Sequence, residues 1–140
     1  GGGLTAPPNQ GRIDMSGISP NCGPTAVAHA VNASVSDIMD LCRTTFKLGA
    51  RWKGRTSVSE LVKLCRMYDR PTKLTRTKGR TLAAWVEWET KPGVSYIVRT
   101  GGHFQHVKDG IVSDQHMSAP VDQFHWKTKR VTHVIELKGD

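Results

Sequence analysis

The order of two kinds of hydrophobic pattern along the chain constrains its fold most strongly. Up to about residue 90, apolar residues recur with helical spacing in four segments. We expect four helices, beginning at or near Cys22, Ser34, Ser57 and Thr81. Beyond this point, runs of β-branched and aromatic residues separated by turn residues predict strands over residues 94–99, 104–107, 110–113 and 131–137. Helices followed by an antiparallel sheet predict an α+β fold, with an N-terminal helical layer packed on a C-terminal sheet.

The length of the chain sets the expected domain organisation. The 140 residues are enough to bury a core without cross-links, and we expect one domain over residues 21–140. Residues 1–20 are rich in Gly, Pro, Asn and Ser, which predicts an extended or mobile lead-in. There is no apolar run of about 18 residues and no charged-then-apolar leader, so we expect neither a membrane span nor secretion.

The three cysteines indicate a reducing compartment, because they are an odd number without close pairs. We therefore expect a cytoplasmic protein. Cys42 and Cys65 each fall within a helical apolar pattern, which predicts buried core thiols. The chain has no Cys-x-x-Cys motif, and His103 with His106 forms only a lone pair of histidines, so we expect no metal and no cofactor.

Cys22 stands where the first expected helix begins, in the segment Asn-Cys-Gly-Pro-Thr. The free N–H groups and the positive dipole end of a helix N-terminus stabilise a thiolate, which is the nucleophilic form of cysteine. This position therefore predicts a reactive thiol. The alternative is simple packing, since free cysteines are often buried as small hydrophobic residues.

His103 and Asp114 are the expected partners of that thiol. Residues 96–114 have the pattern of a strand, a Gly-Gly break, a second strand, an Asp-Gly turn and a third strand. In such a hairpin His103 can face Asp114, or Asp109 if the register differs. An imidazole can take the thiol proton and later protonate a leaving group, while a carboxylate fixes its tautomer. The set predicts acyl transfer, although each residue alone is compatible with a structural role.

The other histidines are weaker candidates for this role. His106 follows His103 by three positions and should point to the opposite face of a regular strand. His29 should lie about 10 Å along the first helix from Cys22. The remaining three have no partner in the sequence pattern, and we expect them to be structural or exposed: His116, His125 and His133.

These motifs together resemble those of the papain-like cysteine peptidases. The segment Asn-Cys-Gly-Pro-Thr-Ala before a helix, and a distant Gly-His-Phe strand followed by Asp-Gly-Ile-Val-Ser-Asp, are similar to those of bacteriocin-leader-processing peptidases and of small phage-encoded proteins assigned as peptidases. The resemblance covers about residues 20–115. It implies a papain-like fold and a protein or peptide substrate, with Cys22 as nucleophile, His103 as general base and acid, and Asp114 as orienting carboxylate.

The sequence departs from this pattern at the oxyanion hole. The family usually has a glutamine about six residues before the cysteine, and Ser16 stands there. The remaining candidate donors to the oxyanion are then the backbone amide of Cys22 and a side chain from Gln10, Ser16 or Asn21. Losing one oxyanion donor typically lowers the rate about 10²- to 10³-fold. The missing glutamine is also compatible with a family member that keeps the fold but has little catalytic activity.

The net charge of +8 suggests an anionic partner. Basic residues cluster in the loop from Lys47 to Arg55, which contains Trp52, and again over residues 63–80. These clusters are compatible with binding of nucleic acid or of an acidic protein, and equally with a solvated surface. The competing function is therefore a catalytically silent papain-like binding module, of phage origin and acting in the host cytoplasm.

Overall fold

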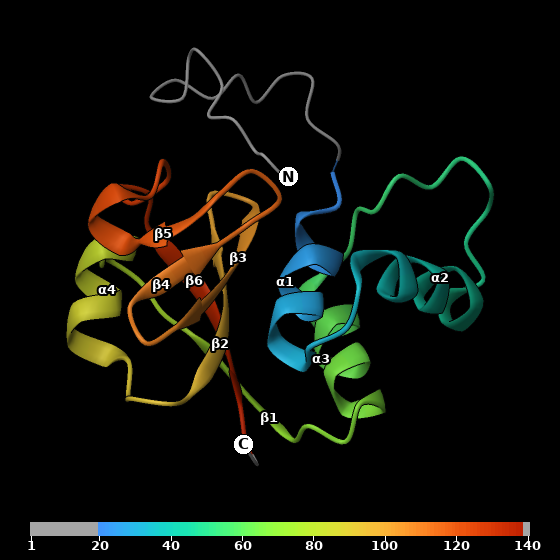
Figure 1. The fold of residues 1–140 in the computed structure, drawn as a ribbon, viewed down its shortest axis with the longest axis horizontal. Coiled ribbons are helices and arrows are strands. Elements are labelled where there is room, and N and C mark those ends of the chain that lie inside the picture. The colour runs from blue at the N-terminus through green and yellow to red at the C-terminus, as the bar shows by residue number, and fades with distance from the viewer. Residues whose placement is uncertain (1–19, 139–140) are drawn as a thin grey trace.

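The computed structural model describes residues 20–138 (Figure 1). The helices in this part of the chain are α1 Cys22–Val31, α2 Val35–Phe46, α3 Val58–Met67 and α4 Leu82–Glu89, with a 3₁₀ turn η1 at Val121–Gln123. The strands there are β1 Thr72–Arg76, β2 Ser95–Thr100, β3 His103–Lys108, β4 Ile111–Ser113, β5 Ser118–Pro120 and β6 Val131–Leu137. The predicted α+β class is confirmed. The predicted lead-in, with Gln10 and Ser16, lies outside the described residues except for Pro20.

Helices α2 and α3 begin after residues whose side chains cap them. Ser34 accepts a hydrogen bond from the backbone N–H of Asp37 at 3.0 Å and thereby caps α2. Ser57 and Glu60 form a reciprocal capping box at the start of α3, with bonds of 3.2 and 2.8 Å. The predicted starts of these helices are therefore confirmed.

The sheet has the strand order β1-β6-β2-β3-β4-β5, and every neighbouring pair is antiparallel. Strands β2, β3, β4 and β6 confirm the four predicted strands within one residue at each end. Strands β1 and β5 were not predicted. Leu74 is the only apolar residue of β1, and this strand is mostly exposed, so its conformation comes from pairing with β6 rather than from its own pattern.

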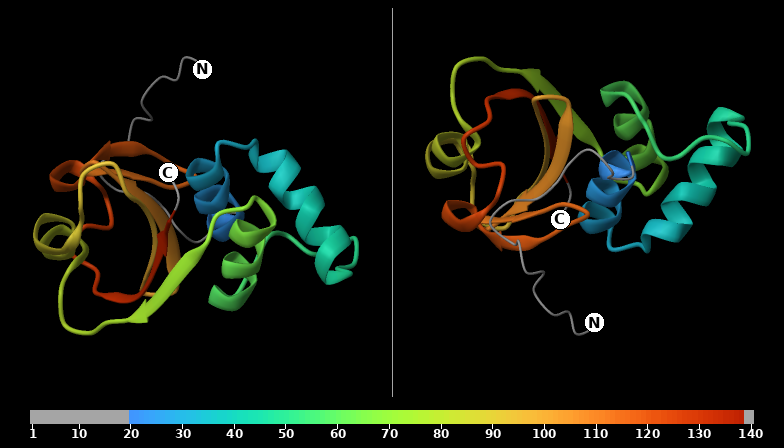
Figure 2. Two further views of the ribbon diagram at one scale, coloured as in Figure 1. Left: turned by 90° about the horizontal axis from the view of Figure 1, so that it is seen from below. Right: turned by 90° about the horizontal axis from the view of Figure 1, so that it is seen from above.

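Helices cover both faces of the sheet (Figures 1 and 2). Helices α1, α2 and α3 share an apolar cluster with Ile97, Phe104, Ile135 and Leu137 of the sheet. Helix α4 lies on the other face and packs with Tyr96, Val98 and further residues of that face. The prediction of a single helical layer is wrong for α4, because alternate residues of β2 are apolar on both faces and both faces must be covered.

Helix α1 packs against β3, and this contact brings the start of the helix beside the start of the strand (Figure 1). Cys22 is the first residue of α1 and His103 is the first residue of β3. Residues 81 positions apart in sequence therefore meet at one end of the helix–sheet interface. Within residues 20–138, no helix is long and apolar enough to cross a membrane.

Gly23 permits the close packing of α1 on the segment before α3. A Cβ at this position would overlap Thr56 Oγ1 and lie 3.1 Å from a methyl carbon of Leu61. We expect Gly23→Ala to lower the free energy of unfolding by about 1–3 kcal/mol, as overpacking does in a tight core. Urea denaturation followed by circular dichroism measures this change.

Two further variants test the cause of this effect. Gly49→Ala is the matched control, because a Cβ there meets no atom within 4 Å, and it should leave stability nearly unchanged. Adding Thr56→Ala to Gly23→Ala should recover part of the loss. Equal stability of Gly23→Ala and the unmodified protein would show that the helix moves without cost and would contradict the prediction.

Candidate active site

The Cys22 thiol lies at the N-terminus of α1 and is partly buried. Its sulfur accepts hydrogen bonds from the backbone N–H groups of Gly23 and Phe104, and it is hydrogen-bonded to the His103 ring. Burial alone would raise the pKa of this thiol, but the bond to His103 and the two N–H donors outweigh burial and lower the pKa below its usual value. The surroundings of the sulfur therefore favour the thiolate over the thiol more than burial alone would.

The β3–β4 hairpin brings His103 and Asp114 together. Its turn, Asp109-Gly110, has positive φ at both residues, 51° and 78°, as the predicted tight Asp-Gly turn requires. His103 Nε2 lies 2.9 Å from Asp114 Oδ2. Asp109 instead accepts a bond from the backbone N–H of Gly93 at 2.7 Å, which gives it a structural role. Asp114 is therefore the carboxylate that the hairpin register selects.

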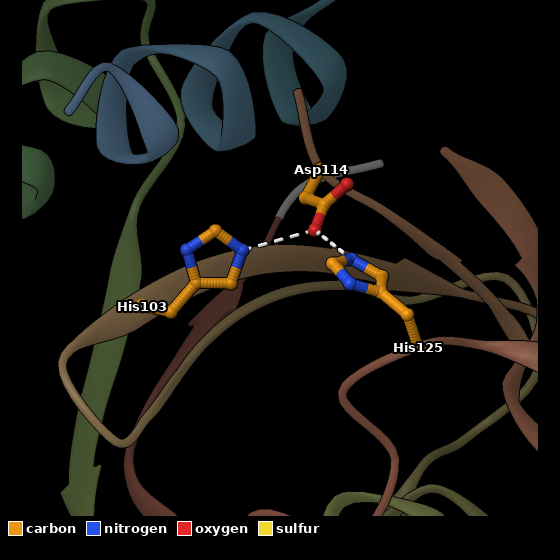
Figure 3. Close-up of side chains that lie close together, drawn as sticks. All are labelled: His103, Asp114 and His125. Atoms are coloured by element: carbon orange, nitrogen blue, oxygen red, sulfur yellow. Dashed lines mark hydrogen bonds and ion pairs between the residues drawn. The ribbon is translucent and has the colours of Figure 1, made fainter. Parts of the chain in front are cut away.

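The Asp114 carboxylate is held by four donors. Figure 3 shows two of them, the rings of His103 and His125. Its Oδ1 accepts from the backbone N–H groups of His116 and Met117 at 2.8 and 3.0 Å. Its Oδ2 lies 2.9 Å from His103 Nε2 and 2.6 Å from His125 Nε2. Since an ionised carboxylate only accepts, both Nε2 atoms must carry protons. The Nδ1 atom of His103 is then the ring nitrogen left for the thiol.

These contacts shift the pKa values of both groups. Burial alone would lower the pKa of His103, but its bonds to Asp114 and Cys22 outweigh burial and raise the pKa to about 9. Burial alone would raise the pKa of Asp114, but its hydrogen bonds outweigh burial and hold the pKa well below the usual value. An imidazolium between a carboxylate and a thiolate is the ionic state that this environment favours.

The sequence interpretation missed His125, which we expected to have no partner. The loop after η1 returns to the sheet and places this ring on Asp114 (Figure 3). The same loop packs the Trp126 ring against His103, at 5.3 Å between ring centroids, and the Trp126 indole N–H donates to Thr100 O at 3.0 Å. The only local signal was the aromatic flank of Phe124 and Trp126, which indicates a packed loop and not its position.

His29 and His106 form a second histidine contact, between α1 and β3. Their rings stack on each other at 5.8 Å, and His106 Nε2 lies 3.2 Å from Ser95 Oγ. His106 therefore lies on the α1 side of β3. The His116 ring packs edge-on against His125 at 5.9 Å, which agrees with the expected structural role.

The expected oxyanion-hole side chains are described only in part. Gln10 and Ser16 lie outside the described residues. Asn21 precedes Cys22 and packs against Gly54, where a Cβ would lie 2.7 Å from the Asn21 Cα. Its Oδ1 is buried and has no hydrogen-bond partner among the described residues, and its side chain does not cap α1. The first-turn N–H groups of α1 lack intrahelical acceptors, and that of Gly23 is hydrogen-bonded to the Cys22 sulfur.

The Asp114 cluster is also where a metal ion could bind. One ligand atom each from His103, Asp114 and His125 lie within 4.8 Å of one another. Two ligands of one tetrahedral zinc ion are about 3.3 Å apart, given bond lengths of about 2.0 Å. The Oδ2 atom is closer than this to both ring nitrogens, at 2.9 and 2.6 Å. The three groups are thus spaced as hydrogen-bond partners.

The other two cysteines are core thiols, as predicted. Cys42 and Cys65 are buried, and burial raises the pKa of each to about 11. In the basic loop, Trp52 is covered by the Arg43 guanidinium, 5.7 Å from the ring centroid, and its indole N–H donates to Arg55 O at 2.8 Å. A base stacking on that face of Trp52 would have to displace Arg43.

No family model matches the chain, and no curated protein is significantly similar to it.

Proposed function

We propose that the protein is a cysteine peptidase of papain-like architecture, or a close relative that cleaves isopeptide or other amide bonds. The observation that carries the proposal is the continuous hydrogen-bonded path from the Cys22 thiol through the His103 ring to Asp114. A thiol at a helix start and an imidazole on a facing strand also agree with that architecture. Asp114 fixes the proton on Nε2, so the other ring nitrogen is available to the thiol.

The acylation step uses the thiolate and the imidazolium in turn. The Cys22 sulfur attacks the carbonyl carbon of the scissile amide, and the C=O electrons move to oxygen. Backbone N–H groups at the start of α1 would stabilise this oxyanion. When the tetrahedral intermediate collapses, the C–N bond breaks and His103 gives its proton to the leaving amine. The products of this half are the free amine and a thioester on Cys22.

The deacylation step reverses the role of His103. The neutral imidazole takes a proton from water, whose oxygen attacks the thioester carbon, and the C–S bond breaks. The carboxylic acid leaves, and the thiolate and imidazolium are restored. An amine in place of water would give acyl transfer by the same residues.

The ionisation of the site predicts its pH dependence. The thiolate exists above the lowered pKa of Cys22, and the imidazolium exists below about 9, the raised pKa of His103. Turnover of a peptide found by screening a library should therefore follow a bell, with its acid limb below the usual thiol pKa and its alkaline limb near pH 9. The rate of Cys22 alkylation by iodoacetamide, followed by mass spectrometry, measures the acid limb without a substrate.

The same thiol in the unfolded protein provides the control. In concentrated urea the alkylation rate should rise once, near the ordinary thiol pKa of about 8.5. If the folded protein also shows a single rise near that pH, the thiol is not activated and the peptidase proposal fails.

A further inference from the structure

Three neighbouring strands place a row of basic side chains across the sheet. Arg76 of β1 pairs with His133 of β6, and His133 pairs with Arg99 of β2. Ile97 and Ile135, which are two positions from Arg99 and His133, face helices α1 to α3. Since side chains two positions apart on a strand share a face, the row lies on the face that packs against α1 to α3, the same face as Phe104.

A pocket of about 690 Å³ opens over this row. Its lining consists of Arg76, Thr77, Lys78, Arg99, Thr132 and His133, and it contains no carboxylate. Within residues 20–138, neither arginine nor Lys78 forms an ion pair. Burial and the two nearby guanidinium groups lower the pKa of His133. The pocket is thus a concentration of positive charge without a counter-charge from the described part of the chain.

The pocket adjoins the candidate active site. Arg99 pairs with Phe104 across β2 and β3, and the N–H of Phe104 donates to the Cys22 sulfur. The Arg99 guanidinium also reaches the turn before His103, since its Nη2 would lie 3.9 Å from a Cβ at Gly102. With strands about 5 Å apart, Arg99 is one strand from Phe104 and Arg76 is about 10 Å farther along the sheet.

We propose that this pocket is a substrate subsite that binds the carboxylates of an acidic polypeptide segment next to the scissile bond. Its role as a subsite rests on the proposed function, whereas its binding of acidic peptide does not. Guanidinium groups bind carboxylates in a bidentate manner. A peptide extended along the row would cross the distance from Arg99 to Arg76 in about three residues, at about 3.3 Å per residue. The ligand is therefore a segment with at least two acidic residues within about four positions.

A polypeptide fits this pocket better than a nucleic acid does. Non-specific binding of single strands combines phosphate contacts with aromatic side chains on which bases stack. The lining contains no Trp, Tyr or Phe. The row of basic residues also lies next to the Cys22 thiol, which is suited to acyl transfer rather than to phosphodiester chemistry.

The test measures binding to the full chain carrying Cys22→Ala, so that no probe is cleaved. The probes are a fluorescein-labelled peptide with alternating Glu and Ala and its counterpart with Gln for every Glu, followed by fluorescence anisotropy. We expect Arg99→Gln and Arg76→Gln each to weaken binding of the Glu peptide about tenfold, with little effect on the Gln peptide. Arg51→Gln and Arg66→Gln remove the same charge outside the pocket and should change binding less than about twofold.

Three outcomes would contradict the proposal that the pocket is a subsite for acidic peptide. The first is absence of binding by the Glu peptide, and the second is equal weakening by all four variants, which would indicate net charge alone. The third is tighter binding of a labelled oligo-dT that depends on Arg76 and Arg99, which would assign the pocket to nucleic acid. The proposed function is judged separately, by alkylation of Cys22 in the unmodified protein, so the failure of one proposal is distinguishable from that of the other.

Discussion

Replacing Cys22 with alanine is expected to abolish amide cleavage, with a loss on the order of 10⁴-fold or more. The sulfur forms the bond to the substrate carbonyl in the proposed mechanism, and the removal of a nucleophile leaves only binding and oxyanion stabilisation. The partly buried side chain is small, so the variant should fold. Turnover of a library peptide and labelling by a thiol-directed acyl electrophile, both at pH 7, measure the effect.

The other two cysteines are the matched controls for this experiment. Cys42 and Cys65 have pKa values raised to about 11, so almost none of either thiol is ionised at pH 7. Cys42→Ala and Cys65→Ala should therefore keep labelling and turnover, apart from the loss of stability that follows from a core cavity. Labelling that stays in Cys22→Ala and disappears in either control variant would refute the role of Cys22.

The parts of this site that the sequence predicts are those encoded by local chemistry. Ser57 and Glu60 specify the start of α3 by their spacing alone. The turn of Asp109 and Gly110 specifies the β3–β4 hairpin, because both residues tolerate positive φ. That hairpin places Asp114 beside His103, and the start of α1 is readable from the motif at Cys22.

The features that the sequence does not predict depend on contacts between distant segments of the chain. Strand β1 carries little apolar pattern and is defined by pairing with β6 at the far end of the chain. His125 reaches Asp114 only because the loop after η1 folds back over the hairpin. The row of Arg76, His133 and Arg99 likewise needs the β1-β6-β2 order, which no local pattern contains.

Asp114→Asn should also cause a large loss, about 10³- to 10⁴-fold in kcat/KM. The backbone N–H groups of His116 and Met117 fix the orientation of the new amide, because these donors can bond to its oxygen and not to its NH₂ group. Its NH₂ group must then face the Nε2 atoms of His103 and His125. Each NH₂ hydrogen requires a lone pair, so neutral His103 would carry its proton on Nδ1. That tautomer cannot accept the thiol proton, as when a triad aspartate becomes asparagine.

The variant should also change the ionisation of the thiol while leaving the fold in place. Loss of the carboxylate removes a group that raises the pKa of His103, so the imidazolium is less populated and the pKa of Cys22 should rise toward its usual value. Alkylation by iodoacetamide at pH 6 should slow accordingly. Asp109→Asn is the matched control, because its oxygen can still accept from Gly93 and Asn tolerates positive φ, so its rates should be unchanged. If Asp114→Asn keeps kcat/KM within about threefold while Cys22→Ala is inactive, the thiol reacts without a carboxylate-fixed imidazole and the triad reduces to a dyad.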